Sequence, residues 1–434
     1  MRAPRVRRTS SARTLALALA LALALALTLT AGACGTGEIT YVNPPSPPST
    51  DVTIKLAPDA EDLSLAAALG WAAAIPGADV SIIPVDSSAS PLVSVSSISG
   101  EITLPGLAAG TYLVRVQRVL TPSEAAKLPS TATGIDGWAT LARVVVSGST
   151  RNVPVAVQAS RRGSLTISEW FFNDPQDPKI GSYSYSQYIE LYNNADTTVY
   201  LDGIRFGQGF HLSYDYPNFP CSAYLQTTGD TTSIWAIDVQ QFPGRGHDYP
   251  VAPGQVVLFG QDAIDHSVIA QGAPDLSHAN FEEEASLDVD NPAVPNMKSV
   301  GPRFQQYHGI NLNPLFNVVF LSLPVTAADL RYSPSLGSEY QWERYPVGKL
   351  LDVATWKTNW NDSEYPACPQ VVSPALDRGP ARGFGSSNYA FETQRSLHRV
   401  QLRPGTRPVF QRTRNSWADF VIKLRSPGVL SPPP

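Results

Sequence analysis

The feature that most limits the fold of this chain is a succession of short apolar runs separated by clusters of glycine, proline and serine. Between residues 51 and 160 these runs occupy residues 52–56, 80–85, 112–116, 141–146 and 153–157. Short apolar runs bounded by turn residues are typical of β-strands, and this spacing is typical of a small antiparallel sandwich. The pattern therefore predicts an all-β fold.

Length and charge narrow the class further. The 434 residues are enough for two or three domains, each with its own hydrophobic core. The formal net charge is −5, whereas a nucleic-acid-binding surface requires clustered lysine and arginine on a basic domain. We therefore expect a multidomain protein that does not bind nucleic acid.

The N-terminus has the pattern of an export signal. Five arginines precede an apolar stretch at residues 15–27, and Ala31, Gly32 and Ala33 stand directly before Cys34. Such segments are removed rather than folded, and this one resembles a bacterial lipoprotein signal, in which the cysteine is acylated and becomes the mature N-terminus. Ala31 stands where these signals usually carry leucine, so a secreted protein with a free Cys34 is the alternative.

A tether follows the signal. Residues 34–50 combine proline with glycine, serine and threonine, a composition that stays extended and buries no core. Such a spacer would let a folded domain stand off a membrane that holds a lipid on Cys34. We expect an outer-membrane lipoprotein of the cell envelope, and otherwise a secreted or periplasmic protein.

Two cysteines remain once Cys34 is assigned to lipidation. Cys221 and Cys368 both lie in proline-containing loop sequences. An even number of cysteines in an oxidising compartment can form a disulfide, and one that closes roughly 147 residues would stabilise the fold by several kcal/mol. Two separate buried thiols are the alternative.

Two segments interrupt the strand pattern before residue 160. Residues 62–74 are rich in alanine and leucine, and residues 121–124 have the capping-box sequence Thr-Pro-Ser-Glu, with proline at the first helical position. The second segment predicts one short helix that ends near Lys127. We expect both segments to be insertions in the loops of the sandwich.

One motif in the first sandwich resembles a known domain family. Residues 104–116 read Leu-Pro-Gly-Leu-Ala-Ala-Gly-Thr-Tyr-Leu-Val-Arg-Val, and residues 76–80 read Pro-Gly-Ala-Asp-Val. They are similar to the turn and strands of transthyretin-like, carboxypeptidase-regulatory-like domains. The resemblance implies a rigid spacer or binding module without catalytic residues.

The second region carries a different signature. Residues 165–170, 187–194 and 199–204 predict strand, strand, turn and strand, and residues 193–196 have turn chemistry. The sequence resembles the lamin-tail type of immunoglobulin-like sandwich, and we expect later strands at residues 251–259, 316–323, 350–355, 396–400 and 417–422. Residues 207–245 and 265–315 are then expected to be loops or an extra subdomain.

These long inserts carry a further resemblance. Residues 234–235, 241–244, 249–251, 263–266, 275–282 and 294–296 are similar to an uncharacterised bacterial lipoprotein family, domain of unknown function 4876. Its members combine a transthyretin-like module with such a second region and are often encoded beside TonB-dependent outer-membrane receptors. The resemblance implies a compartment, an architecture and an outer-membrane receptor as partner, but no activity.

The residues with most potential for chemistry gather in one insert, at residues 247–290. The weak metal-ligand candidates there are Asp265, His266, His278, Asp288 and Asp290. Oxygen-rich loops can hold calcium, and histidine with carboxylate can bind zinc or transfer protons. The alternative, which we favour, is solvated loop residues and turn caps without a cofactor.

Two further groups have simpler interpretations. Glu169 and Glu190 lie at the lamin-tail signature, where the corresponding acids are structural at the sandwich edge, and we interpret them as markers of the fold rather than as a catalytic pair. The aromatic residues of the second region are assigned to the core rather than to a binding face. They include Tyr183, Tyr185, Tyr188, Tyr214, Tyr216, Phe219, Tyr224, Trp356 and Trp360.

The sequence thus predicts five segments: a signal peptide at residues 1–33, a lipidated tether at 34–50, a transthyretin-like sandwich at 51–160, a lamin-tail-like sandwich at 161–425 and a proline-rich tail at 426–434. We expect a non-enzymatic envelope lipoprotein that presents a binding module and is accessory to a TonB-dependent receptor. The alternatives are a structural or adhesive surface lipoprotein, and a metal-assisted hydrolase that uses the insert at 247–290.

Overall fold

The protein is described here from a computed structural model, and its architecture is all-β, as the sequence predicts. The structure describes residues 49–432 except for 86–87, 133, 173–174, 210–229, 231, 286–289, 302–311, 313–315, 327–328, 330–331, 334–341, 358–371 and 383–393. Within these residues, none of the helices has the length and apolar character needed to cross a bilayer.

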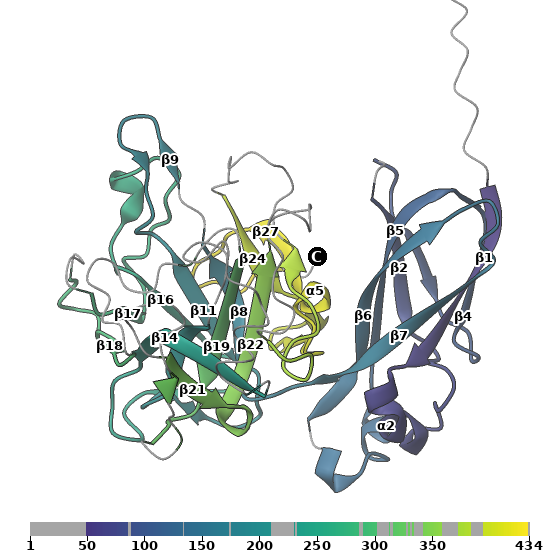
Figure 1. Ribbon diagram of the computed structural model, residues 1–434, viewed down its shortest axis with the longest axis horizontal. Coiled ribbons are helices and arrows are strands. Elements are labelled where there is room, and N and C mark those ends of the chain that lie inside the picture. Colours follow the sequence, from purple (N-terminus) through teal and green to yellow (C-terminus); the bar gives the residue numbers. More distant parts are fainter. Residues whose placement is uncertain are drawn as a thin grey trace, which may run out of the picture. The chain divides into compact units, whose positions relative to one another are not determined.

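The first part of the structure is built from seven paired strands in the order β3-β2-β5-β6-β7-β1-β4 (Figure 1). Their bounds are β1 (Ser49–Pro58), β2 (Asp79–Pro84), β3 (Leu92–Val95), β4 (Glu101–Ala108), β5 (Gly110–Val119), β6 (Ile135–Val146) and β7 (Asn152–Arg161). The five predicted runs lie within β1, β2, β5, β6 and β7, apart from Val85 at the end of β2. Residues 104–108, expected to form a turn, instead belong to the strand β4.

Strand β7 joins two layers. Its first half, from Asn152 to Val157, pairs in parallel with β1, and its second half, from Gln158 to Arg161, pairs with β6. One apolar core contains side chains from both groups of strands, including Ile54 of β1 and Val116 of β5. Along β1 every second residue is buried, so that one face of the strand packs into this core, as expected for a half-buried sheet.

The short helices of this part lie in its loops. The Ala- and Leu-rich segment forms a turn of 3-10 helix, η1 (Ala60–Asp62), and then α2 (Leu63–Ala68). The predicted capping box is confirmed at α3 (Pro122–Ala125): the Thr121 side chain accepts from the Glu124 backbone N–H, and the Glu124 carboxylate accepts from the Thr121 backbone N–H. A further 3-10 turn, η2, spans Ser130–Ala132.

The second part contains two larger sheets. The six-stranded sheet has the order β17-β16-β11-β8-β24-β27. Its strands are β8 (Leu165–Phe171), β11 (Tyr188–Asn193), β16 (Val256–Gly260), β17 (Phe281–Glu282), β24 (Arg395–Arg399) and β27 (Phe420–Leu424). The lamin-tail signature residues thus form the two central strands, β8 and β11. Residues 417–419, expected in a strand, instead belong to the helix α5 (Ser416–Asp419), which directly precedes β27.

The other sheet has the order β20-β21-β14-β13-β19-β22-β23, and β18 pairs with β14. Its strands are β13 (Arg205–Gly209), β14 (Ser233–Gln241), β18 (Lys298–Ser299), β19 (Phe316–Ser322), β20 (Tyr332–Ser333), β21 (Trp342–Pro346), β22 (Leu350–Lys357) and β23 (Ala381–Arg382). The expectation that residues 207–245 are loops or an extra subdomain is wrong for residues 207–209 and 233–241, because they belong to β13 and β14, which are neighbouring strands of this main sheet. Residues 210–229 and 231 lie outside the described residues.

The remaining elements are short. Three two-stranded pairings involve β9 (Gln176–Asp177) with β10 (Gly181–Ser182), β12 (Val199–Tyr200) with β15 (Pro250–Val251), and β25 (Gln401–Arg403) with β26 (Val409–Phe410). The strand predicted at residues 199–204 is therefore limited to β12. Two 3-10 turns, η3 (His266–Val268) and η4 (Val347–Lys349), complete the described elements.

A core of large aromatic side chains lies between the two sheets of the second part. Trp170 of β8 meets Trp356 of β22 with ring centroids 4.7 Å apart, and it stacks on Phe420 of β27. Trp356, Tyr183 and Tyr188 are buried, whereas Tyr185 is only half-buried. The assignment of the aromatics to the interior is confirmed for Trp356, Tyr183 and Tyr188. Tyr214, Tyr216, Phe219, Tyr224 and Trp360 lie outside the described residues.

Candidate functional site

The insert that the sequence singles out for metal does not form a shared ligand set where it is described. His266 is buried, with Nδ1 2.8 Å from the Tyr183 hydroxyl and Nε2 3.0 Å from the Asp262 carbonyl oxygen. Burial lowers the pKa of His266, which keeps its ring neutral at pH 7. Both ring nitrogens are thus engaged in hydrogen bonds within the fold.

The neighbouring candidates hold turns. Asp265 accepts from Ser267, and Asp275 accepts from Ser277 in the same way. His278 Nε2 lies 3.0 Å from the carbonyl oxygen of Pro427, and Asp290 accepts from the Asn296 amide. Asp288 lies outside the described residues. In the part of the chain that the structure describes, no three His, Cys, Asp or Glu side chains are grouped to hold a metal ion.

The three cysteines are not part of the described structure. Cys34, Cys221 and Cys368 all lie outside the described residues, so lipidation and the disulfide remain predictions.

His247 is another histidine of the insert at residues 247–290. The ring of Tyr200 packs edge-to-face on the His247 ring, at a centroid distance of 4.5 Å.

The first candidate site that the structure itself provides is the carboxyl pair of Glu169 and Glu190. These residues face each other across the two central strands β8 and β11, and both are buried. Glu169 accepts hydrogen bonds from the hydroxyls of Tyr188, Ser396 and Ser426. The structural interpretation is therefore supported, but the pair occupies the centre of the sheet rather than its edge.

The two carboxyl groups differ in their surroundings. Glu190 accepts from the Ser168 hydroxyl at 2.7 Å, whereas its Oε2 atom is buried without a hydrogen-bond partner among the described residues. Burial, followed by the charge of Glu169, raises the pKa of Glu190 to about 8. Glu190 is thus mainly protonated at neutral pH.

Ser396, His398 and Glu169 lie close together, as a serine, a histidine and an acid do in hydrolytic triads. The Ser396 hydroxyl is 2.8 Å from His398 Nε2, and His398 Nδ1 is 3.4 Å from Glu169. However, Ser396 also donates to Glu169 directly at 2.7 Å and is fully buried, and the backbone N–H of Ser426 donates to the same carboxylate at 2.9 Å. This arrangement is a closed structural cluster, because a nucleophile needs access to a substrate carbonyl.

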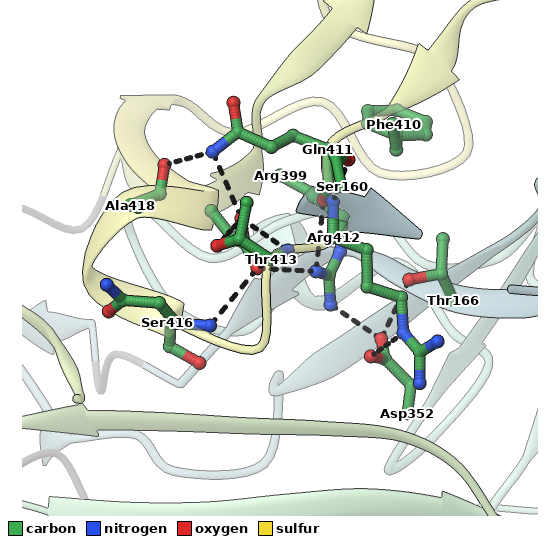
Figure 2. Close-up of polar contacts among 12 residues, drawn as sticks. Ser160, Thr166, Asp352, Arg399, Phe410, Gln411, Arg412, Thr413, Ser416 and Ala418 are labelled. Carbon is green, nitrogen blue, oxygen red and sulfur yellow. Dashed lines mark hydrogen bonds and ion pairs between the residues drawn. The ribbon is translucent and has the colours of Figure 1, made fainter. Parts of the chain in front are cut away.

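The second candidate site is an arginine–aspartate network around Asp352 of β22 (Figure 2). Asp352 accepts from Arg399 Nη2 at 2.5 Å and from Arg412 Nε at 3.1 Å, and it also accepts from the Thr166 hydroxyl at 2.8 Å. Burial alone would raise the pKa of Asp352, but the charges of Arg399 and Arg412 hold it below its usual value. The carboxylate therefore stays ionised, with a full set of donors.

A second acid completes this network. Asp419 of α5 accepts from the backbone N–H and the hydroxyl of Thr413 and from the Gln411 amide, and it lies 3.8 Å from Arg399. Burial raises the pKa of Asp419 above its usual value. Figure 2 shows Gln411 and Thr413 on the segment that carries these contacts. Residues 411–419 are thus held by polar contacts rather than by a regular strand.

The same segment contacts the first seven strands. The Arg412 backbone N–H donates to the Ser160 hydroxyl at 3.0 Å, and the Arg412 carbonyl accepts from the Arg161 N–H at 2.9 Å. Nearby, Arg378 forms ion pairs of 2.7 Å with both Asp59 and Glu61. Ion pairs of Arg378 and backbone hydrogen bonds of Arg412 therefore connect residues 49–161 to the second part of the structure.

A cavity of about 170 Å³ adjoins this network. Its lining combines apolar residues, among them Leu350 and Leu376, with the charged residues Arg399, Arg412 and Arg414. In the part of the chain that is described, Arg414 is the one non-glycine residue with a left-handed backbone, at φ 59°. Such backbones are uncommon outside glycine, asparagine and aspartate and are strained.

The third candidate site is the open edge strand β3. In the described structure β3 pairs only with β2 and lies at the end of its sheet. Val93 is 76% exposed, Val95 60% and the following Ile98 93%. Residues 88–100 contain no charged side chain, although charges on an edge strand are a usual protection against pairing with other chains.

The sequence interpretation missed the network and the edge strand. Six arginines lie within residues 395–414, a density that could have indicated a buried ionic network. Of their acidic partners, Asp352 lies far from these arginines in the sequence, and Asp419 lies near them but in no pattern that marks it as an ion-pair partner. Only the fold therefore reveals the pairing. The uncharged run at residues 88–100 was a usable signal for β3, but its serine content was typical of a loop.

Comparison with known proteins returns structural likeness at low identity. No family model and no curated protein matches the chain. A crystal structure of a DUF4876 family protein from Bacteroides thetaiotaomicron VPI-5482 is similar at 20% identity, covers 88% of this chain and 96% of its own, and has a TM-score of 0.47.

Two further solved structures are more distant. Fervidolysin from Fervidobacterium pennivorans, a keratinolytic enzyme related to subtilisin, is 15% identical over 38% of this chain and 27% of its own, with a TM-score of 0.17. A DUF3823 family protein from Parabacteroides merdae ATCC 43184 is 6% identical over 47% of this chain and 79% of its own, also with a TM-score of 0.17.

Proposed function

We propose that this protein is a non-enzymatic, lipid-anchored cell-envelope protein that binds a TonB-dependent outer-membrane receptor through the open edge of β3. The proposal also assigns the chain to the DUF4876 lipoprotein family, on the sequence patterns of its inserts. The export signal and Cys34 support the anchor. The observation that carries the binding role is the exposed, uncharged edge formed by β3.

The chemistry of this edge favours an extended partner segment. An edge strand presents unpaired backbone N–H and C=O groups, which another strand can satisfy by adding to the sheet. Val93 and Val95 lie on one face of β3 and Leu92 on the other, so an added strand would find apolar contacts on both faces.

The opposite edge of the same sheet differs. β4 contains Pro105, which has no N–H to donate, and Glu101, which pairs with Lys55 at 3.0 Å. Proline and charge are both devices that discourage edge pairing. This contrast between the two edges of one sheet supports the proposal that β3 pairs with a strand of a partner.

The test is capture of the partner with an altered edge. A C-terminally tagged chain would be purified from detergent-solubilised native membranes, as wild type and as Val93→Lys/Val95→Lys. The matched control is Val145→Lys, because Val145 is 69% exposed but lies on β6, where it pairs with Thr111 of β5, rather than on the edge strand β3. Mass spectrometry would identify the co-purified proteins and the N-terminal peptide.

We expect an outer-membrane receptor to accompany wild type and Val145→Lys, and to be lost from the β3 variant. We also expect the N-terminal peptide to begin at an acylated Cys34. A receptor retained by the β3 variant, or no receptor with wild type, would overturn the docking role. An unmodified Cys34 would overturn the lipid anchor and leave a secreted protein.

A further inference from the structure

The cavity beside the arginine–aspartate network differs from the protein's apolar cores. Its volume of about 170 Å³ is that of several water molecules, since each occupies about 30 Å³ in the liquid. Apolar cavities stay dry, but charged residues are part of this lining. The mixed lining is that of a small-molecule site, and the volume, below the roughly 300 Å³ at which drug-sized sites begin, limits the ligand to a small one.

Positive charge predominates in the lining. The lining includes three arginines and only two acids, Asp352 and Asp419. Asp352 is fully committed to Arg399 and Arg412. Asp419 is the weaker counter-charge, because burial raises its pKa.

Arg414 is the arginine least matched by its surroundings. Its Nη1 donates to the Ala375 carbonyl at 3.0 Å and its Nη2 to Glu61 at 2.9 Å, but its Nε is buried with no hydrogen-bond partner among the described residues. Glu61 is itself 54% exposed at its side chain, so that ion pair is screened by solvent.

The backbone at Arg414 is held in place by neighbouring contacts. The Arg414 carbonyl accepts from the Arg378 N–H at 2.8 Å, and Thr413 is fixed by its bonds to Asp419. A strained conformation persists only where its surroundings enforce it, and such residues cluster at ligand sites. A glycine would adopt φ 59° without strain, whereas arginine adopts it at a cost in conformational energy.

The geometry points to a binding site in this cavity for a small organic oxyanion, a carboxylate or phosphate ester of about monosaccharide size. The oxyanion meets the guanidinium groups of Arg412 and Arg414, and the carbon skeleton packs against Leu350 and Leu376. Arginine suits this role because its planar donors match carboxylate and phosphate oxygens. The site lies in the second part and is independent of the β3 edge.

The test uses the purified full mature chain and isothermal titration calorimetry. The charged probes are galacturonate and glucose 6-phosphate, and their uncharged counterparts are galactose and glucose. Inorganic phosphate alone tests whether the organic body contributes. We expect at least one charged probe to bind, and to bind at least tenfold more tightly than its uncharged counterpart and than inorganic phosphate.

Two variants locate the site. Arg414→Gly removes the guanidinium and relieves the backbone, so it is expected to fold and to weaken binding roughly tenfold or more. Leu376→Phe fills the apolar end without a change of charge and is expected to reduce binding as well. Arg407→Gln is the matched control, because Arg407 is an exposed arginine that pairs with Asp196 away from the cavity lining.

Three results would overturn the inference. The first is that neither charged probe binds more tightly than its uncharged counterpart. The second is that inorganic phosphate binds as tightly as the sugar derivatives, which would remove the organic body from the site. The third is that Arg414→Gly and Arg407→Gln bind the probe equally well, which would move the site elsewhere.

Discussion

Glu190→Gln is expected to stabilise the protein at alkaline pH. In the folded state burial and Glu169 raise the pKa of Glu190 to about 8, against 4.5 for an unperturbed glutamate. Between these pH values the unfolded chain releases a proton that the folded chain keeps, so unfolding becomes more favourable as pH rises. The stability contribution is complete below pH 4.5 and is lost progressively up to about pH 8.

The size of the effect follows from the linkage relation. Each pH unit well between the two pKa values changes the free energy of unfolding by about 1.4 kcal/mol. Because the group is partly titrated at pH 5 in the unfolded chain and at pH 8 in the folded chain, this group alone removes about 3–4 kcal/mol between pH 5 and pH 8. Glutamine at this position keeps the acceptor for Ser168 and cannot ionise. The variant should thus be close to wild type at pH 5 and about 3–4 kcal/mol more stable at pH 8.

Urea unfolding at pH 5, 6, 7 and 8, followed by tryptophan fluorescence, measures this difference. The matched control is Glu343→Gln, because Glu343 is also buried but accepts from the Tyr345 hydroxyl at 2.8 Å and faces Arg205 at 3.8 Å. That variant should lose stability at pH 8 rather than gain it. If Glu190→Gln and wild type show parallel pH profiles, Glu190 is ionised in the folded state and the reasoning fails.

Three further predictions concern stability. Asp352→Ala leaves Arg399 buried with Asp419 as its nearest acid at 3.8 Å, so urea unfolding should show a loss of stability of about 3–5 kcal/mol. The control Asp196→Ala removes an exposed ion pair and should cost less than about 1 kcal/mol. Equal losses of stability in the two variants would contradict the buried network. Thr121→Ala removes the cap of α3 and should cost about 1 kcal/mol, with Ser123→Ala as the weaker comparison. Because burial lowers the pKa of His266, the stability of the folded protein should fall as pH drops below about 6.5. In a pH series of thermal unfolding, His266→Gln should make this fall less steep. The same dependence of stability on pH in wild type and variant would show that the folded His266 ring takes up the proton as freely as the unfolded one.

The strands were largely predictable from the sequence because their apolar runs reflect local burial. β1 carries the alternating pattern that its packing requires, and the capping box of α3 is a local signal with one geometric meaning. In β8 and β11, by contrast, every residue is buried, including Glu169 and Glu190, which a sequence pattern of half-buried strands does not predict. The errors lie where tertiary pairing decides. β14 looked like part of an insert because its pairing with β13 and β21 spans long stretches of chain.

The candidate sites were harder to predict. Sequence density pointed to the acids and histidines at residues 247–290, but Asp265 and Asp275 cap turns, which is what aspartate before serine commonly does. Asp352 gave no local signal, since its partners Thr166, Arg399 and Arg412 all lie far from it in the sequence. Ionic networks of this kind are defined only in space.

The buried network also explains why polar residues persist where apolar ones would pack. Buried ion pairs add little net stability compared with well-packed apolar side chains, because the desolvation of the charges offsets their attraction. Here, however, Arg412 binds Asp352 with its side chain and residues 160–161 with its backbone. The segment that lines the cavity is therefore also the segment that contacts the first seven strands, and an apolar replacement of Arg412 would remove the ion pair with Asp352 that positions it. Positioning, rather than stability, is the property that this cluster provides.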